Sequence, residues 1–359
     1  MLKRTHTCND LRTTDDGSTV VLAGWVNTYR DHSKSLVFID LRDRRGLTQI
    51  VFDVADSPAE IVEIAQGLRR EDVIAIRGIV RVRGGGANPK LDTGKIEVIA
   101  MELEVLNKAE TPPILPDDVE AEKMGEEVRL RNRHIDLRRP KMQGILETRS
   151  KVTQFTRAYF HQRDFLEIET PLLIKSTPEG ARDFVVPSRL EAGSWYALPQ
   201  SPQLFKQILM IAGCDRYIQI PKCLRDEDPR ADRQAEFTQI DLEMSFIDQG
   251  DVLDTMGDFA VELWKEMLGV DVGEIPRMTW HEAMETYGID RPDLRFGLEI
   301  SDISDLAAKT DFKVFHAALE KTSPMGSGVV KAFRVPGGAE KLTRKLTDGY
   351  SEWIKTFGA

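Results

Sequence analysis

The stretch of this 359-residue chain best suited to chemistry lies between residues 216 and 246, where arginines and carboxylates are densely mixed. Hydrophobic alternation predicts two β-arms here, joined by a long connection. The charged residues of the connection are Asp226, Glu227, Asp228, Arg230, Asp232, Arg233 and Glu236. Arginine forks bind phosphate, and carboxylates hold Mg²⁺ or accept from an amino group. The composition therefore indicates either a polyphosphate site or a solvated hairpin loop rich in salt bridges.

Strand periodicity gathers the polar residues of the second arm on one face, because successive side chains of a strand point to opposite faces. The polar face is predicted to contain Phe237, Gln239, Asp241 and Glu243, and the apolar face Ile240, Leu242, Met244 and Phe246. On the first arm, Gln219, Cys223 and Arg225 share a face. Phe237 offers an aromatic stacking surface. A half-polar sheet face is either exposed to solvent or part of a binding site.

A second set of polar residues lies on the helix predicted over residues 201–213. Ser201 is suited to cap this helix, and Gly213 to end it. Gln203 and Lys206 are three residues apart and share a face, while neighbouring apolar residues supply the buried side. This polar pair faces a ligand or, as the alternative, solvent.

Composition excludes several classes of protein. Three cysteines without a Cys-x-x-Cys pair argue against a disulfide framework and a structural zinc site. No run approaches the about 20 apolar residues of a membrane span, so a cytoplasmic protein without a membrane partner is expected. The net charge of −10 means that nucleic acid would need a local basic patch. One such patch is Arg129, Arg131, Arg133, Arg138 and Arg139, whose alternative is a solvated linker.

The elements that position these residues begin with five strand-like runs within residues 20–106 and one helix, at 57–70, after the third run. This order is typical of the oligonucleotide-binding (OB) barrel. Residues 110–127 are proline-rich and then acidic, which indicates a hinge. A helix over 145–163 and a strand over 165–173 open a further domain. Pro171 restricts that strand to a sheet edge or a subunit interface.

Four stretches together resemble the bacterial-type aspartyl-tRNA synthetases, which are class II aminoacyl-tRNA ligases. They are FLEIETPLL, TPEGARDF, ALPQSPQLFKQ and RDEDPRADRQAEFTQIDLEMSF. The resemblance covers nearly the whole chain and implies a multidomain β and α+β fold, in which an OB barrel precedes an antiparallel class II sheet with flanking helices. The implied domains are an anticodon-binding barrel at 1–107, a hinge at 108–140, a catalytic core at 141–295 and part of a bacterial insertion domain at 296–359.

The same resemblance implies site residues. Arg225 would be catalytic and hold the α-phosphate of ATP, with Phe237 stacked on adenine. The implied ATP-binding residues are Arg225, Asp226, Glu227, Gln234 and Phe237, and the implied aspartate-binding residues are Glu179, Ser201, Gln203, Lys206, Arg225 and Asp241. Lys206 would pair with the substrate carboxylate, and Asp241 would orient that cluster. In the barrel, Arg30, Phe38 and Gln49 match anticodon contacts. His32 stands where some members that charge both tRNA(Asp) and tRNA(Asn) carry a histidine, and the alternative is a loop histidine without selective effect.

The implied reaction joins ATP and L-aspartate to aspartyl-adenylate and transfers the aspartyl group to tRNA(Asp), with tRNA(Asn) as a further substrate to test. It uses ATP with Mg²⁺, needs no prosthetic group or protein nucleophile, and is expected in a homodimer. The family's third motif, a glycine-rich strand and helix, is not found in this sequence, so an incomplete sheet is expected. The alternatives are a non-catalytic tRNA-binding remnant and a related class II ligase.

Overall fold

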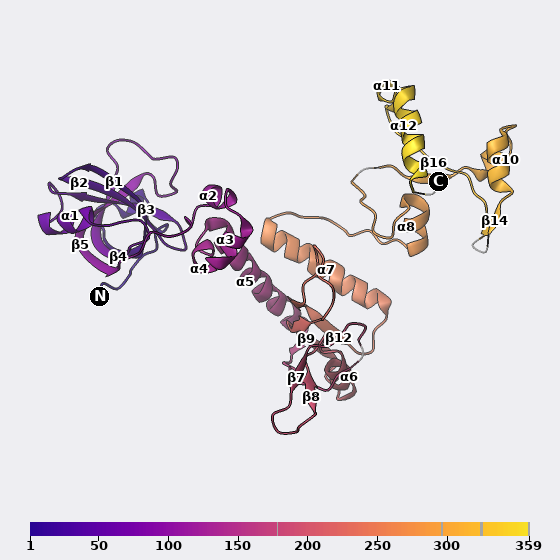
Figure 1. Cartoon of the computed structure of the whole chain (residues 1–359), viewed down its shortest axis with the longest axis horizontal. Coiled ribbons are helices and arrows are strands. Elements are labelled where there is room, and N and C mark those ends of the chain that lie inside the picture. Colours follow the sequence, from indigo (N-terminus) through magenta and orange to yellow (C-terminus); the bar gives the residue numbers. More distant parts are fainter. Residues whose placement is uncertain (178, 296, 324–325, 358–359) are drawn as a thin grey trace. The chain divides into compact units, whose positions relative to one another are not determined.

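The computed structural model describes residues 1–177, 179–295, 297–323 and 326–357. The chain forms two compact units, residues 1–270 and 271–359 (Figure 1). The boundaries predicted after residues 107, 140 and 295 divide the chain more finely than this, and they stay predictions.

A closed five-stranded barrel opens the first unit, after the short 3-10 helix η1 (Thr13–Asp15). Its strands are β1 (Thr19–Ser33), β2 (Leu36–Arg42), β3 (Leu47–Asp53), β4 (Val73–Val82) and β5 (Ile96–Asn107), hydrogen-bonded in the order β1-β2-β3-β5-β4. The helix predicted after the third strand is α1 (Ala59–Gln66). β3 and β5 pair in parallel, and the other registered neighbours are antiparallel. The five strands and helix predicted for an OB barrel are confirmed.

Inward-facing aliphatic side chains hold the barrel together. Leu22, Ile39, Ile50, Ile76 and Val98 belong to its core and are fully buried. Each such side chain contributes about 1.5–3 kcal/mol relative to an exposed one. Since alternate residues face inward, the outer face of each strand remains available for ligands.

Gly78 permits the bulge at which β4 curves onto β5. A Cβ at this position would lie 2.4 Å from the carbonyl oxygen of Ile99. Only glycine avoids that clash.

Three short helices occupy the predicted hinge: α2 (Asp118–Glu122), α3 (Glu126–Arg131) and α4 (Arg133–Asp136). Arg139 is 2% exposed and bonds both Asp118 and Asp136 at 2.8 and 2.7 Å. Arg138 stacks over the Trp25 ring of β1 at 4.9 Å and bonds Glu71 at 2.8 Å. The basic patch predicted here is therefore largely structural, because carboxylates pair with most of its arginines.

A mixed three-stranded sheet follows, in the order β12-β9-β6. Its strands are β6 (Leu166–Glu167), β9 (Arg216–Gln219) and β12 (Asp241–Met244), and the strand pairs β7 (Val185–Pro187)–β8 (Trp195–Ala197) and β10 (Lys222–Leu224)–β11 (Glu236–Thr238) lie nearby in the chain. The helices are α5 (Pro140–His161), α6 (Gln203–Ile211) and α7 (Gln249–Leu268). α5 and α7 contact each other (Figure 1), and their core residues Tyr159, Phe160 and Phe259 pack with Phe165 and Ile218.

Two strand predictions need correction. The strand expected over 165–173 is limited to β6, and Pro171 lies beyond it, although β6 does form the sheet edge. Phe246 was expected on the apolar face with Leu242 and Met244, which do pack against the core, but it is 97% exposed. The physical reason is that β12 ends at Met244 and Phe246 adopts a left-handed φ of 57°, so alternation stops before it.

The second unit consists of short elements. They are α8 (Trp280–Tyr287), β13 (Ile300–Asp302), α9 (Ser304–Ala307), α10 (Lys313–Leu319), β14 (Thr322–Ser323), β15 (Gly326–Ser327), β16 (Lys331–Phe333), α11 (Gly338–Lys341) and α12 (Arg344–Lys355). β13 pairs with β16, and β14 with β15. Across the described parts of both units, none of the helices is long and apolar enough to cross a membrane.

Candidate functional sites

The two arms of the charged hairpin bring the predicted polar residues into cross-strand pairs. Cys223 pairs with Phe237 across β10 and β11, and Gln219 pairs with Asp241 across β9 and β12. Directly paired residues of antiparallel strands share a face. The structure therefore places Cys223 with Phe237 on one face of β10–β11, and Gln219 with Asp241 on one face of β9–β12.

Lys206 of α6 reaches this face and forms its electrostatic centre. Its Nζ lies 2.8 Å from Oδ1 of Asp241 and 3.4 Å from Oε2 of Glu243. Lys206 is 9% exposed and Asp241 is 8% exposed, so their charges are largely removed from water. Oδ2 of Asp241 is buried and accepts no hydrogen bond within the described chain. Since buried polar atoms are normally paired, this oxygen is suited to accept from a ligand.

Ser201 and Glu179 meet at the start of α6. The Ser201 hydroxyl donates to Oε2 of Glu179 at 2.6 Å, and Thr177 donates to the other oxygen at 3.2 Å. The expectation that Ser201 caps the helix is wrong, because its hydroxyl is engaged by Glu179 and Pro202 occupies the cap position without a side-chain bond. Gln203 lies in the first turn of α6, one turn before Lys206.

Gln200 shapes the same region, and sequence reasoning missed it. Its amide accepts from the backbone NH of Ala181 at 3.1 Å and donates to the carbonyl of Ala181 at 2.9 Å and to Asp183 at 2.5 Å. These bonds fix the loop that carries Glu179 against the start of α6. The only available signal was its position next to Ser201 in the sequence.

Arg225 and Phe237 form the second part of the face. The guanidinium carbon of Arg225 lies 5.1 Å from the ring centroid of Phe237, within the range of a cation–π contact. Asp226 is held by Arg182, whose carbonyl accepts from its backbone NH at 3.0 Å. Asp226 and Glu227 line an open cavity of about 500 Å³. Gln234 is exposed in the connection and is not brought to this cavity.

Cys223 and Tyr217 are buried and neutral, and they pair across the strands with Phe237 and Glu243. Burial, with a further contribution from Asp241, raises the pKa of Cys223 to about 11, and its thiol donates to Gln239 at 3.2 Å. Burial likewise raises the pKa of Tyr217, whose hydroxyl donates to Gln219 at 2.7 Å. Neither supplies an anionic nucleophile at neutral pH. Sequence reasoning did not identify Tyr217.

The described residues include no group of three or more histidine, cysteine, aspartate or glutamate side chains placed to hold a metal ion. Mg²⁺ that arrives with a nucleotide needs fewer protein ligands, because phosphate oxygens and one or two carboxylates suffice. Glu227, on the wall of the cavity, can supply one carboxylate.

The predicted barrel residues also share a face. Arg30 pairs with Phe38 across β1 and β2, and the His32 ring meets Phe38 edge-on at 5.2 Å. Gln49 of β3 pairs with Asp40 of β2, which lies two residues after Phe38 and therefore on the same face. The Gln49 side chain is buried, with 2% of its surface exposed. Asp40, which sequence reasoning missed, binds both terminal nitrogens of Arg30 at 2.8 and 2.9 Å.

Comparison with known protein families shows which family this chain belongs to. Residues 125–344, more than half of the chain, match the tRNA synthetases class II (D, K and N), and residues 20–106 match the OB-fold nucleic acid binding domain. The chain belongs to the class II tRNA synthetases. The resemblance predicted from the four sequence stretches is thereby confirmed, as is the fold class of an OB barrel followed by a class II domain.

Curated relatives of this class II synthetase chain are named for aspartate. It is 52% identical to the Aspartate–tRNA(Asp/Asn) ligase of Caldanaerobacter subterraneus subsp. tengcongensis over 100% of this chain and 59% of the relative. It is 53% identical to the enzyme of the same name from Salinibacter ruber, over 94% of this chain and 53% of the relative. The chain thus spans less than two thirds of the length of these relatives.

Two solved structures of asparaginyl-tRNA synthetases have the same fold as much of this chain. The asparaginyl-tRNA synthetase of Pyrococcus horikoshii, complexed with asparaginyl-adenylate, superposes with a TM-score of 0.66 at 25% identity, covering 76% of this chain and 59% of that chain. The asparaginyl-tRNA synthetase of Entamoeba histolytica, with the same adenylate, gives 0.58 at 26% identity, covering 71% of this chain and 56% of that chain.

Proposed function

We propose that this chain acts in the ATP-dependent ligation of L-aspartate to tRNA, first as aspartyl-adenylate and then as aspartyl-tRNA. The observation that carries the proposal is the buried Lys206–Asp241 pair on the polar face. An ammonium group has three donors, and two of them face Asp241 and Glu243. The third is available for the side-chain carboxylate of aspartate.

The remaining acceptors of this cluster suit the other end of the amino acid. Oδ2 of Asp241 and the carboxylate of Glu179, which Ser201 and Thr177 hold, are acceptors for the substrate ammonium group. The third donor of Lys206 also discriminates against asparagine, because the neutral amide offers it a weaker, uncharged acceptor than the carboxylate of aspartate does. Sites built on such polar contacts reject the wrong analogue by about 10⁴-fold or more.

ATP is proposed to bind along the Arg225–Phe237 part of the face. Phe237 offers its ring to the adenine, and Arg225 neutralises the α-phosphate as the α-carboxylate of aspartate attacks it and the bond to the β-phosphate breaks, releasing pyrophosphate. The α-carboxylate is itself the nucleophile, so the neutral Cys223 thiol takes no part. Mg²⁺ bound with ATP would supply charge neutralisation on the phosphates when present.

RNA is proposed to bind the outer barrel face that carries Arg30, Phe38, His32 and Gln49, in keeping with the OB-fold match. The relatives are named for both tRNA(Asp) and tRNA(Asn). We propose that this protein also charges both tRNAs, and that His32, beside Phe38, is the residue that relaxes the selection between them. The charging reaction also implies a cytoplasmic location.

The direct test is aminoacylation by the gene product that contains this sequence. Transcripts of tRNA(Asp) and tRNA(Asn) are incubated with ATP and labelled aspartate, and labelled asparagine serves as the control. We expect aspartate, and not asparagine, to appear on both tRNAs. Strict preference for tRNA(Asp) would remove the role given to His32, whereas RNA binding without charging would favour the non-catalytic alternative.

Phe38→Ala is expected to weaken tRNA binding by about 1–3 kcal/mol, because it removes a base-stacking surface. Arg30→Ala should also weaken binding, while the ATP affinity of both variants stays unchanged, since Arg225 and Phe237 lie in another part of the chain. Filter binding and nucleotide titration measure the two affinities. An equal loss of ATP affinity would contradict separate RNA and nucleotide sites.

Homodimerisation is proposed through the edge strand β6 and the segment after it. Leu166, Leu172 and Leu173 are about half exposed beside an unpaired strand edge, which is costly for a monomer. Sedimentation of the gene product is expected to give twice the monomer mass, and Leu172→Glu/Leu173→Glu should shift it toward monomer. A monomer for the unmodified protein would reject the proposal.

A further inference from the structure

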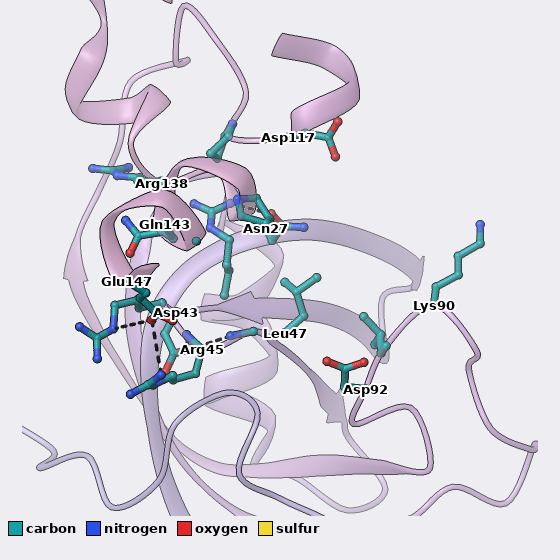
Figure 2. A pocket seen from close by; sticks show the side chains of 17 residues that line it. Asn27, Asp43, Arg45, Leu47, Lys90, Asp92, Asp117, Arg138, Gln143 and Glu147 are labelled. Carbon is teal, nitrogen blue, oxygen red and sulfur yellow. Dashed lines mark hydrogen bonds and ion pairs between the residues drawn. The ribbon is translucent and has the colours of Figure 1, made fainter. Parts of the chain in front are cut away.

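A polar cavity of about 420 Å³ lies where the barrel meets the linker and α5. Its walls come from the β2–β3 turn, the β4–β5 connection and the first half of α5. Figure 2 shows Arg45 and Glu147 close together on one side of the cavity and Lys90 on the other. None of these residues belongs to the sites described above.

The cavity continues the outer face that is proposed to bind RNA. Along β2, Phe38, Asp40 and Arg42 follow one another at two-residue intervals and therefore lie on the same face. Arg42 pairs with Leu47 of β3, and both of these residues line the cavity. Four residues of strand span about 13 Å. An OB fold covers about 4–16 nucleotides, so a strand stacked on Phe38 has to continue along the protein in some direction.

The β2–β3 turn presents two arginines on a fixed backbone. The buried Asp43 carboxylate accepts from the backbone NH groups of Cys8, Arg45 and Gly46 at 2.9, 2.7 and 3.3 Å. The side chains of Arg44 and Arg45 are nevertheless 61% and 52% exposed. The fixed backbone lowers the ordering cost of binding an anion, so that this cost is confined to the two side chains.

Cations and carboxylates around the cavity are nearly balanced in number, but the ion pairs of this turn are the weakest. Arg44 and Arg45 share a single oxygen of Glu147, at the long distances of 3.7 and 3.4 Å. The other carboxylates of the wall have partners of their own, since Asp117 caps α2 and Asp92 accepts from Asn9. Arg42 and Arg138 also line the cavity, but Glu71 holds both of them. Lys90 is exposed on the opposite wall, so Arg44 and Arg45, which lie together on the turn, are the pair suited to one phosphate.

We propose that this cavity binds the sugar–phosphate backbone of the RNA that flanks the bases on Phe38, with Arg44 and Arg45 as phosphate ligands. The inference rests on the proposed function, because it assumes that RNA occupies the barrel face. A phosphate would displace the weak contacts of both arginines to Glu147 and gain bidentate ones. The site adds affinity without reading sequence.

The test uses the 359-residue chain and two RNA probes, the anticodon stem–loop of tRNA(Asp) and its seven-nucleotide loop alone. Binding is followed by fluorescence anisotropy over a range of salt concentrations. Arg44→Gln/Arg45→Gln should weaken stem–loop binding by about tenfold or more. It should also reduce the salt slope of log K by about 1.8, because each phosphate contact contributes about 0.9 on a duplex such as the stem. Binding of the isolated loop should change little.

Two controls separate this role from loss of charge or of structure. Arg70→Gln/Arg77→Gln removes two exposed cations outside the cavity and should leave stem–loop binding within about twofold of the unmodified chain. Glu147→Gln removes the competing carboxylate and should strengthen binding. Because the Glu147 and arginine variants are expected to act in opposite directions, misfolding cannot produce the pattern.

Unchanged stem–loop affinity and salt slope in Arg44→Gln/Arg45→Gln, with a loss in Phe38→Ala, would overturn the cavity proposal and leave the barrel site intact. Equal losses for the stem–loop and the isolated loop would also overturn it, since the arginines would then act within the loop. No effect of Phe38→Ala would instead count against RNA binding by the barrel, and thus against the proposed function.

Discussion

Lys206→Met is expected to lower aspartate-dependent ATP–pyrophosphate exchange by about 10³-fold or more in the gene product that contains this sequence. Methionine keeps the unbranched side chain but removes the charge that pairs with Asp241 at 2.8 Å and is proposed to bind the substrate carboxylate. The loss should appear chiefly in kcat/KM for aspartate, and the preference for aspartate over asparagine should fall with it. Exchange assays with each amino acid measure both effects.

Stability has to be measured in the same variant. Removing one partner of a buried ion pair costs about 3–5 kcal/mol, because the other charge stays buried. Lys206→Met/Asp241→Asn removes both charges and should recover most of that stability without recovering exchange. Recovery of exchange together with stability would show that Lys206 acts only through folding. Retained discrimination in Lys206→Met would contradict its role in recognition.

The elements that depend on local pattern were predictable from the sequence. The barrel strands follow from Val and Ile alternation between turn residues, and the face of Phe237 and Asp241 follows from a period of two. The prediction for Phe246 was wrong because β12 ends at Met244, and Phe246 itself adopts a left-handed backbone conformation that turns the chain. Strand length was also overestimated at β6, where apolar alternation continues beyond the pairing with β9.

Contacts between distant segments were not predictable from local pattern. Ser201 has the right residue type for a helix cap, but its partner Glu179 lies 22 residues away in a loop that folds back. Arg138 and Arg139 belong to a basic run that suggests a polyanion site, yet Glu71 and Asp118 neutralise them. Tyr217 and Gln200 were missed because nothing in the sequence marks a buried hydrogen-bonding partner.

Arg225→Gln is expected to lower kcat for adenylate formation by about 10²–10³-fold, the usual effect of losing one preorganised electrostatic donor. Stem–loop RNA binding should stay unchanged, because the barrel face lies in a different part of the chain. Arg225→Lys should recover only part of the rate. An ammonium group keeps the charge, but it cannot form the planar, bidentate contact or stack on Phe237 as the guanidinium does at 5.1 Å.

Arg189→Gln is the matched control, since it removes the same charge from an exposed position in the connection between β7 and β8. Arg189 does not line the cavity that contains Asp226 and Glu227. We therefore expect its exchange rate to remain within a few-fold of the unmodified protein, because an exposed charge is screened by salt. Equal losses in Arg225→Gln and Arg189→Gln would mean that the loss of any nearby cation weakens ATP binding. A loss confined to Arg225→Gln would assign transition-state stabilisation to the arginine that stacks on Phe237.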